Sequence, residues 1–520
     1  MGQMYCYPPK VPHRSGPTLP TGTPPSAPAS ALWGRVKGGV APTGAALVLL
    51  LAGCAPDLGA MPEMAKPDSF ATSQSFKAKK NDWPTQTWWT AYDDAGLNSL
   101  IDEALQGSPT LKMASARLRA AVAEAGTAEA DLWPTLTASG NLSEYQVSSN
   151  QLGKDQRAFM PKGWHHEAQI AAGLQYQLDF FGKNRAALAA ATSAAEAAQA
   201  DEAAARLQIS TGVATVYAQL VQLFADKRLA EEALHQREES AGLTRKRLAS
   251  NLENASAVAQ AEAQVWAAHG TLDTVNRLIT LTQNQLAALM GKGPDRGRSI
   301  TPDQVKTKLA SPGLPENLPL SLVGRRPDIV AARKRAEAAA SSIKVANASF
   351  YPEVNLVGQF GVQSLDAKYL LTAKSEFGSF GPSVTLPIFD YGRLTNQYGK
   401  ARADYDAAAA SYDATLTDAL RDVADAYTNR QSVETEILHA RAALKASEEA
   451  YRVIKIRYGA GLARYIEVLS TETDLINQRR TVSDLETQAF SYDIALVRAL
   501  GGGYAVSPNT ADGTAVAKKR

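Results

Sequence analysis

The sequence predicts an α+β membrane protein in which very long helices alternate with short amphipathic strands, in an order that occurs twice. Three observations support this prediction: Ala-rich stretches without proline, short segments of alternating apolar and polar residues, and paired motifs at constant offsets. The 54 Lys and Arg nearly balance the 52 Asp and Glu in 520 residues. This balance excludes a general nucleic-acid binder.

Residues 1–53 are expected to be a leader and a lipoprotein signal peptide. Two basic residues precede a short apolar run, which is too short for an ordinary membrane-spanning helix and ends in Leu-Ala-Gly before Cys54. Leu-Ala-Gly-Cys resembles a bacterial lipobox, which would make Cys54 the lipid-bearing first residue of the mature chain. The alternative is an ordinary signal peptide followed by an incidental cysteine. Ala55 favours outer-membrane sorting, since an Asp there would resemble an inner-membrane retention signal.

Paired motifs predict an internal twofold repeat. Pro109 and Pro327 each open an Ala-rich run, and an offset of 218 also relates the Trp-Pro and Tyr-Pro pairs that end these runs. An offset of 210 relates Gly182 to Gly392 and Gly291 to Gly501. The expected parts are a lipidated N-terminal extension at 54–92, a first repeat at 93–310, a second repeat at 311–504 and a disordered tail at 505–520.

Four segments show the period-two alternation of a strand with one apolar face: 135–142, 168–180, 353–362 and 379–388. Strands of this length fit a membrane barrel with a wet lumen, and the alternative is a soluble half-buried sheet. Four strands cannot close a barrel, and unpaired edge groups in lipid cost several kcal/mol each. Several chains would therefore share one barrel, and three chains would give twelve strands, an even number.

Two stretches without proline, 183–250 and 393–458, predict helices of roughly 100 Å. Turns are expected at residues 249–251 and 459–461, where Asn and Gly permit a left-handed conformation. The returning helices 253–290 and 463–499 reach about half of that length, and helices 95–130 and 327–349 would fill the rest beside them to form a tapering tube. A seven-residue seam, interrupted by Arg430, predicts coiled-coil packing along the second long helix; its members are Val423, Ile437, Leu444, Tyr451 and Tyr458.

Several motifs in a fixed order resemble one family, the TolC-like outer-membrane factors in the NodT-type efflux lipoprotein branch. They are the lipobox, Trp88-Trp89 with Tyr92-Asp93-Asp94, Leu178 to Lys183, Leu286 to Gly291, Arg325 to Ile329, Leu386 to Asp390 with Gly392-Arg393, and Ala499 to Gly503. One departure is Arg333, where the commoner form carries Glu, and we expect it to change a local ion pair.

The resemblance implies a homotrimer with a twelve-stranded β-barrel, four strands per chain, that continues into a long periplasmic α-helical coiled-coil barrel. It implies a passive outer-membrane conduit for drugs or other small toxic molecules, with a periplasmic adaptor and an inner-membrane transporter as partners. It implies no catalysis and no cofactor beyond the lipid on Cys54. The sequence contains no GxSxG, HExxH or P-loop pattern. A periplasmic adaptor and a structural coiled-coil lipoprotein without a pore are the alternatives.

The resemblance also places a gate at the periplasmic tip, formed by Tyr458, Arg464 and Glu467. Three copies of Glu467 around a narrow axis would form a ring that attracts cations, and Tyr458 or Arg464 would hydrogen-bond neighbouring helices to hold the tip shut. The alternative is that these residues are solvated tip residues.

Adaptor docking is expected around the two helical turns, near residues 245–256 and 455–466. The segment that resembles an adaptor contact contains Arg457, Gly459, Gly461 and Leu462. Small residues permit close helix approach in any coiled coil, so composition alone supports docking weakly.

Two further motifs receive structural interpretations. In Arg325-Arg326-Pro327-Asp328, Pro327 suits the first helical position and Asp328 favours the helix N-terminus. The pair His165-His166 is expected in the loop between the first two strands, without enough neighbouring ligands for a metal.

Overall fold

The computed structural model describes residues 56–505 apart from 78, 147, 149–162, 302–312 and 317. These residues belong to one compact unit, Gly53–Arg520. The predicted signal peptide, Cys54 and the tail beyond residue 505 lie outside the described residues.

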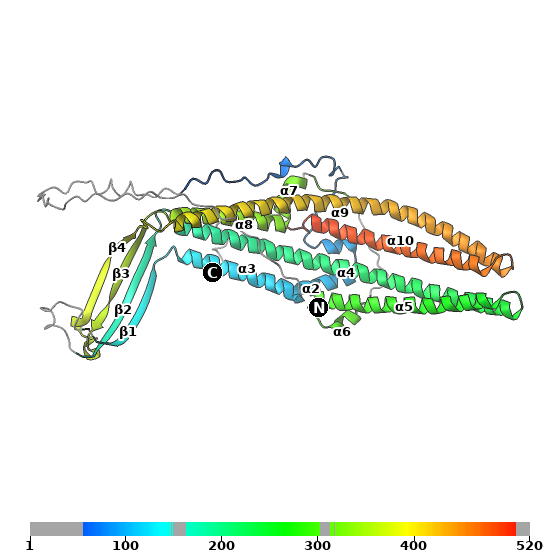
Figure 1. Ribbon diagram of the computed structural model, residues 1–520, viewed down its shortest axis with the longest axis horizontal. Coiled ribbons are helices and arrows are strands. Elements are labelled where there is room, and N and C mark those ends of the chain that lie inside the picture. The colour runs from blue at the N-terminus through cyan, green and yellow to red at the C-terminus, as the bar shows by residue number, and fades with distance from the viewer. Residues whose placement is uncertain are drawn as a thin grey trace, which may run out of the picture. The chain divides into compact units, whose positions relative to one another are not determined.

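Long helices and one small sheet make up this unit (Figure 1). The helices are α2 (Ala95–Gly107), α3 (Pro109–Ala130), α4 (Lys183–Ala249), α5 (Ala255–Leu289), α6 (Pro294–Arg298), α7 (Leu318–Arg325), α8 (Pro327–Ala348), α9 (Arg393–Gly459) and α10 (Tyr465–Ala499). The strands are β1 (Thr135–Tyr145), β2 (His165–Leu178), β3 (Glu353–Ser364) and β4 (Glu376–Thr385).

The predicted long helices are confirmed. Helices α4 and α9 each have 67 residues, and α5 and α10 each have 35. Gly182 and Gly392 open α4 and α9 in the left-handed conformation, with φ of 74° and 81°. Within the described ranges, none of the helices combines the length and the apolar character needed to cross a membrane.

The expected helix over 95–130 is divided into α2 and α3. Ser108 between them has extended backbone, with ψ of 122°, and Pro109 starts the second helix. Proline has no N–H to donate and disfavours helical backbone in the residue before it, so the chain starts a new helix here.

Helix ends meet at two junctions that carry the paired motifs. At the end of α5, a Cβ on Gly291 would lie 2.7 Å from the carbonyl oxygen of Gly107 at the end of α2. At the end of α10, a Cβ on Gly501 would lie 2.0 Å from the carbonyl oxygen of Arg325. Both glycines have positive φ, 70° and 87°, so glycine is required here for close approach and for backbone conformation.

In the half of the unit that contains the two turns, the helices form a row in the order α5, α4, α10, α9. In the half next to the sheet, they form a row in the order α3, α4, α8, α9. Figure 1 shows the strands at one end of these rows and the α4–α5 and α9–α10 turns at the other. Of the seam predicted along α9, Val423 and Tyr458 are buried, whereas Ile437, Leu444 and Tyr451 are partly buried. Arg430, which interrupts the seam, is only 2% exposed. Arg430 is accommodated because its Nη1 and Nε lie 3.0 and 3.3 Å from carboxylate oxygens of Glu434 and Asp493.

The sheet is antiparallel in the order β1-β2-β3-β4. Its register aligns the apolar positions of all four strands on one face, because residues paired across an antiparallel ladder share a face. Two such rows are Leu136-Leu174-Gly358-Phe380 and Ala138-Ala172-Phe360-Gly378. The other face carries polar rows such as Thr137-Gly173-Gln359-Ser379 and Gln177-Asn355-Ser383.

Strand limits differ from the alternation at six of the eight ends, and only the starts of β1 and β3 agree with it. β2 begins at His165, so the expectation that His165-His166 lies in a loop is wrong: His166 pairs with Glu144 of β1, and their Nδ1 and Oε1 atoms lie 3.0 Å apart. Polar cross-strand pairs extend this ladder where alternation no longer marks it. β4 ends at Thr385, since Pro387 cannot donate to a ladder.

The N-terminal segment before α2 lies along α9. Arg402 Nη2 donates to the Gly59 carbonyl at 2.8 Å, the Tyr405 hydroxyl donates to the Pro62 carbonyl at 3.1 Å, and an Asp413 carboxylate oxygen accepts from the Ala65 N–H at 2.8 Å. We call residues 56–77 the strap. Further along, a cluster of Trp88, Trp89 and Tyr92 is buried against α4, α5 and α10.

Candidate functional site

The sheet exposes its apolar face. Leu136, Phe380 and Val384 are 75%, 61% and 64% exposed, although none of them is polar. In the described residues, β1 pairs only with β2 and β4 only with β3, so each has one unpaired edge. An exposed apolar face with two open edges is unstable in water and needs both an apolar surrounding and further strands.

At the end of the helices opposite the sheet, the α4–α5 turn and the α9–α10 turn have the same geometry. Asn251 and Gly461 adopt positive φ of 54° and 79°, as expected for these helix ends. The N–H groups of Leu252 and Leu462 each donate at 2.8 Å, to the carbonyls of Arg247 and Arg457. The two hairpins are therefore closed by the same hydrogen-bonded turn.

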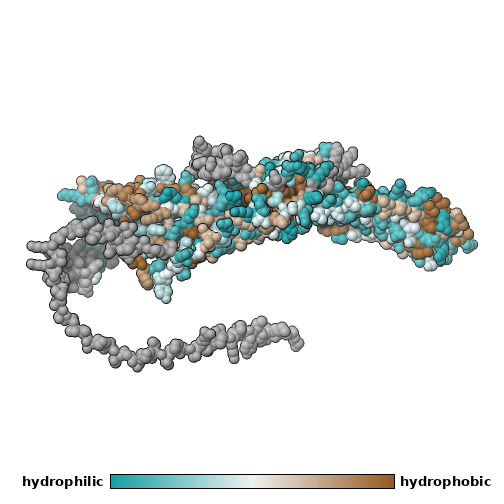
Figure 2. Space-filling view, turned by 90° about the horizontal axis from the view of Figure 1, so that it is seen from above, coloured by the Kyte–Doolittle hydropathy of each residue, from teal (hydrophilic) through white to brown (hydrophobic). Residues whose placement is uncertain are grey.

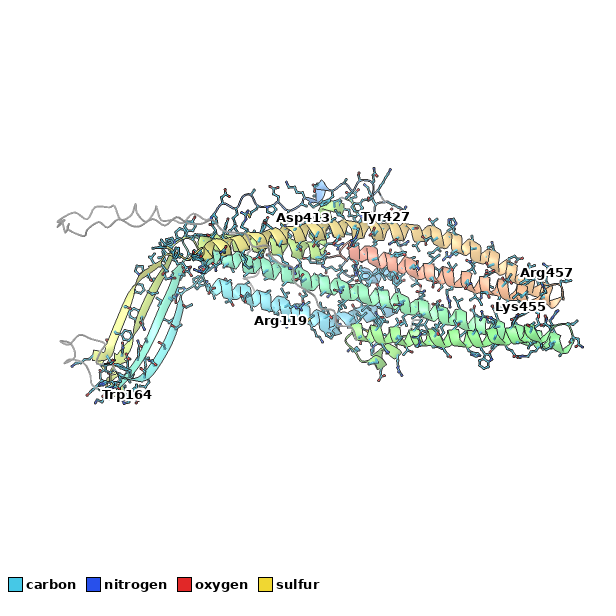
Figure 3. The ribbon with its side chains drawn as sticks, viewed as in Figure 1. Arg119, Trp164, Asp413, Tyr427, Lys455 and Arg457 are labelled. Atoms are coloured by element: carbon cyan, nitrogen blue, oxygen red, sulfur yellow. The ribbon has the colours of Figure 1, made fainter. Side chains whose placement is uncertain are left out.

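Both turns expose a leucine. Leu252 and Leu462 are 65% and 69% exposed, and Figure 2 shows hydrophobic residues gathered at this end of the molecule. Leu462 is one of the predicted docking residues, and Leu252 is its counterpart at the offset of 210, a relation that the paired motifs made readable. Of the other predicted docking residues, Arg457 is exposed near Lys455 (Figure 3), Gly459 is the last residue of α9, and Gly461 makes the turn.

Tyr458 is buried, only 1% exposed, and binds the neighbouring hairpin of its own chain. Its hydroxyl lies 3.2 Å from Thr244 Oγ1 and 3.4 Å from Glu253 Oε2. Arg247 Nη1 donates to the Tyr458 carbonyl at 2.8 Å, and its guanidinium lies 4.6 Å from the ring centroid. Burial raises the pKa of the Tyr458 hydroxyl. These contacts join α9 to α4 at the tip.

Arg464 and Glu467 start helix α10. Glu467 Oε1 accepts from the Arg464 N–H at 3.0 Å, which satisfies an unpaired donor at the helix N-terminus. The Arg464 side chain is 86% exposed, and its Nε lies 3.8 Å from the same oxygen. Within one chain, therefore, Tyr458 is an interhelix contact, whereas Arg464 and Glu467 are solvent-accessible.

Further from the turns, ion pairs lie in the interface between the α4–α5 hairpin and the α9–α10 hairpin. Glu472 of α10 is 1% exposed, and its Oε1 lies 3.8 Å from Arg237 Nε of α4. Burial raises the pKa of the Glu472 carboxyl, and the positive charges of Arg237 and Lys455 partly offset this rise. Arg479 and Glu232 make a second ion pair across the interface at 3.2 Å. Ion pairs therefore join the two hairpins beside a buried apolar cluster that includes Ala241, Ile454 and Val468.

The Arg-Arg-Pro-Asp motif has the predicted structural role. Pro327 is the first residue of α8, and Asp328 lies in its first turn. Arg326 is buried and its Nη2 lies 2.6 Å from Asp328 Oδ2. Arg333, the departure from the family pattern, makes a local ion pair with Glu337 at 3.0 Å.

The model of the outer membrane efflux protein family matches residues 100–292 and 318–502. The chain therefore belongs to this family, which confirms the predicted resemblance to TolC-like channels. An exposed apolar sheet at one end and a helical tip at the other fit this assignment. The chain is an outer-membrane efflux conduit.

Relatives of known name agree with this assignment. The crystal structure of the outer membrane protein VceC from Vibrio cholerae is 41% identical, with a TM-score of 0.75, and covers 81% of this chain and 100% of that chain. Fusaric acid resistance protein FusA of Burkholderia cepacia is 34% identical over 368 residues, 69% of each chain. Multidrug resistance outer membrane protein MdtP of Escherichia coli (strain K12) is 28% identical over 454 residues, 86% of this chain and 92% of that one.

Proposed function

We propose that three copies of this chain form a passive exit channel in the outer membrane, with a shared twelve-stranded barrel and a periplasmic helical tube. The observation that carries this proposal is a four-stranded sheet with an exposed apolar face and two unpaired edges. In lipid, an unpaired backbone group costs several kcal/mol, so the edge of β4 requires the β1 edge of a neighbouring copy. The two halves of the chain, with equal pairs of helix lengths, are an internal repeat.

The channel passes small toxic molecules outward from an inner-membrane transporter through a periplasmic adaptor. FusA and MdtP are named for resistance to fusaric acid and to multiple drugs, which supports this class of cargo. A conduit of this kind needs no catalytic residue and no cofactor, since the transporter supplies the energy.

The barrel assignment is tested by adjacent residues on opposite faces of β4. Phe380→Arg places a charge on the lipid-facing side and is expected to destabilise the folded barrel by about 2–4 kcal/mol. Ser379→Arg, on the lumen side, is expected to fold and to change conductance. Heat-resistant trimer on gels and single-channel recording measure both. Equal tolerance of the two arginines would indicate a soluble sheet instead.

A lipid on Cys54 anchors the chain beside the barrel. Gly59 of the strap binds Arg402, nine residues from the start of α9, which corresponds to about 14 Å of helix. Five extended residues from Gly59 to Cys54 reach about 17 Å. The strap therefore permits Cys54 to reach the level at which α9 joins β4, where the membrane begins.

Mass spectrometry of chain extracted from membranes tests the anchor. The expected N-terminal peptide begins at Cys54 and carries acyl chains, and in the Cys54→Ser variant both the cleavage and the acyl mass are expected to disappear. An unmodified thiol on Cys54 in membrane-extracted protein would reject lipidation.

The two exposed leucines, Leu252 and Leu462, and the small residues beside them form the adaptor-docking surface. Three copies would present six apolar turns at the periplasmic end, which suits the tips of helical hairpins on an adaptor. Arg457, Gly459, Gly461 and Leu462 contribute the second turn of each chain.

Photocrosslinking in the native host tests docking. A benzophenone side chain placed at position 252 or 462 is expected to capture a periplasmic protein with helical hairpins, because both positions are exposed at the tip. The same side chain at position 122, 42% exposed on α3, serves as the control and is expected to capture none. Equal capture at all three positions would refute a docking surface at the tip.

The tip is also the gate. Tyr458 holds α9 against α4 in each chain, and three copies of Glu467 form a ring of negative charge at the narrow end, with Arg464 beside it. Such a ring favours cations. Opening requires the α9–α10 hairpin to separate from α4, which breaks the Tyr458 contacts with Thr244, Glu253 and Arg247.

Glu467→Gln tests the ring without removing the helix cap, since Gln also accepts at this position. The expected result is lower cation-over-anion selectivity in bilayer recordings, because the ring loses its charge. Glu124→Gln on exposed α3 is the matched control and is expected to leave selectivity unchanged. If the cation-over-anion selectivity of Glu467→Gln equals that of the wild type, the proposed ring of negative charge is rejected.

A further inference from the structure

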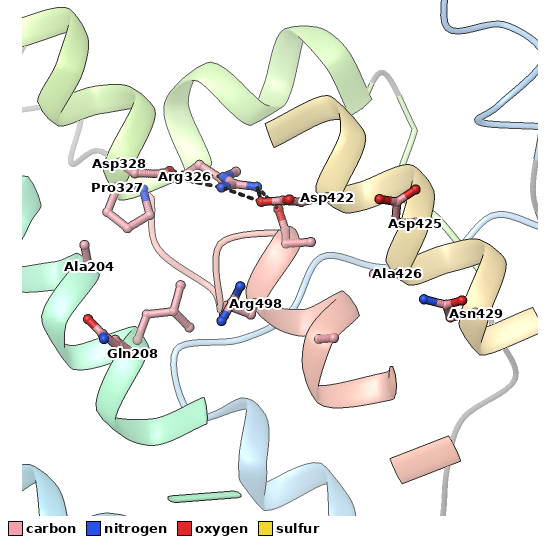
Figure 4. A pocket seen from close by; sticks show the side chains of 13 residues that line it. Ala204, Gln208, Arg326, Pro327, Asp328, Asp422, Asp425, Ala426, Asn429 and Arg498 are labelled. Carbon is pink, nitrogen blue, oxygen red and sulfur yellow. Dashed lines mark hydrogen bonds and ion pairs between the residues drawn. The ribbon is translucent and has the colours of Figure 1, made fainter. Parts of the chain in front are cut away.

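A cavity of about 490 Å³ lies where α10 ends and α8 begins, between α4 and α9. Figure 4 shows it from close by. This volume falls in the range of sites for drug-sized ligands. Its walls carry three carboxylates, Asp328, Asp422 and Asp425, and two guanidinium groups, Arg326 and Arg498.

Arg326 is a fixed part of the wall. Its side chain is 10% exposed, and its Nη2 lies 2.6 Å from Asp328 Oδ2 and 3.4 Å from Asp422 Oδ2. Its Nη1 donates to the carbonyls of Ala499 and Ala419 at 3.4 and 3.5 Å. Because these partners occupy the guanidinium, Arg326 shapes the cavity and is not free to bind a ligand.

Asp328 and Asp422 are the partners of Arg326, and the remaining two charged side chains, Arg498 and Asp425, are available. Arg498 of α10 is exposed and makes no ion pair within the described residues. Asp425 of α9 is 68% exposed, and its one recorded ion pair, with Arg421, is long at 4.0 Å. Among the described residues, the cavity thus has an unpaired cation and a weakly paired anion on two different helices, and the amides of Gln208 and Asn429 and the apolar Leu207 also line it.

The cavity opens on the face of the helix row that lies opposite the strap. On α9, Asp413 binds the strap and Asp422 lines the cavity. Nine residues are about two and a half helical turns, so these two side chains point to opposite sides. On α10, Leu496 and Leu500 pack toward Trp83 on the strap side, whereas Ala495 and Ala499 line the cavity.

This orientation places the cavity inside the tube, given the proposed function on which the inference rests. The strap leads to Cys54, and a lipid on Cys54 must lie outside the tube. The opposite face is therefore the lumen, and each trimer contains three such cavities.

We propose that this cavity is a transit site in the channel for small zwitterions with an apolar body. The ligand's ammonium group binds Asp425 and its carboxylate binds Arg498, while its apolar part lies on Leu207 and the alanines. Two charge-assisted hydrogen bonds select the zwitterion over a molecule with only one of the charges. Conduction requires such a site to be weak, so dissociation constants on the order of 1 mM are expected.

Three dansyl probes with one fluorophore and different charges test the proposal: dansyl-lysine is a zwitterion, dansylcadaverine a cation and dansylglycine an anion. Fluorescence anisotropy is measured with the full-length trimer in lipid nanodiscs. Dansyl-lysine is expected to bind most tightly of the three. Arg498→Gln is expected to weaken dansyl-lysine and dansylglycine about tenfold and to leave dansylcadaverine unchanged.

Asp425→Asn is expected to produce the complementary pattern, weakening dansyl-lysine and dansylcadaverine but not dansylglycine. Asp404→Asn and Arg452→Gln are the controls, because both residues lie on exposed parts of α9 outside the cavity. Binding that is equal for the three probes, or unchanged in both cavity variants, would overturn the proposal.

Conductance separates this inference from the proposed function. A trimer that conducts ions normally but shows no charge-selective binding overturns the transit site and leaves the channel intact. A protein that binds dansyl-lysine but forms no conducting pore overturns both the channel and the assignment of this cavity to a lumen.

Discussion

The register of the four strands is the constraint on which the rest of this molecule depends. Side chains alternate between the two faces of a strand, so one step in the pairing of β2 with β3 would exchange the apolar rows for the Thr, Ser and Gln rows. The observed register gathers the apolar positions on one exposed face. An apolar face toward lipid and a polar face toward water are what a membrane pore requires.

Helices α4 and α9 follow directly from β2 and β4, so the sheet also determines where the long helices start. Aspartates hold both connections: Asp179 accepts from the Arg185 N–H at 3.0 Å, and Asp390 accepts from the Leu394 N–H at 2.9 Å. Lys183 at the start of α4 also contacts Glu353 at the start of β3. The direction of the long helices is thus coupled to the sheet by polar contacts at both connections.

The two helix junctions at Gly291 and Gly501 have similar backbone contacts but different side chains. Ser108 precedes Pro109 at one, and Arg326 precedes Pro327 at the other. Ser108 is small and buried, whereas Arg326 brings a charge that needs Asp328 and Asp422 around it. The second junction is therefore polar, and Arg326, Pro327 and Asp328 also line the cavity of about 490 Å³.

Local sequence alone predicted the long helices, the four strands in outline and the two turns, because periodicity, proline and glycine act over a few residues. It did not predict the start of β2 at His165, which depends on pairing with β1. The positive φ of Asn251 and Gly461 and the start of α8 at Pro327 were all predictable in this way. Tertiary structure alone decided which groups meet. The contact of Tyr458 with Thr244 spans 214 residues, and the strap contact of Asp413 with Ala65 spans 348. No local pattern encodes such contacts, because they depend on how whole helices lie against one another.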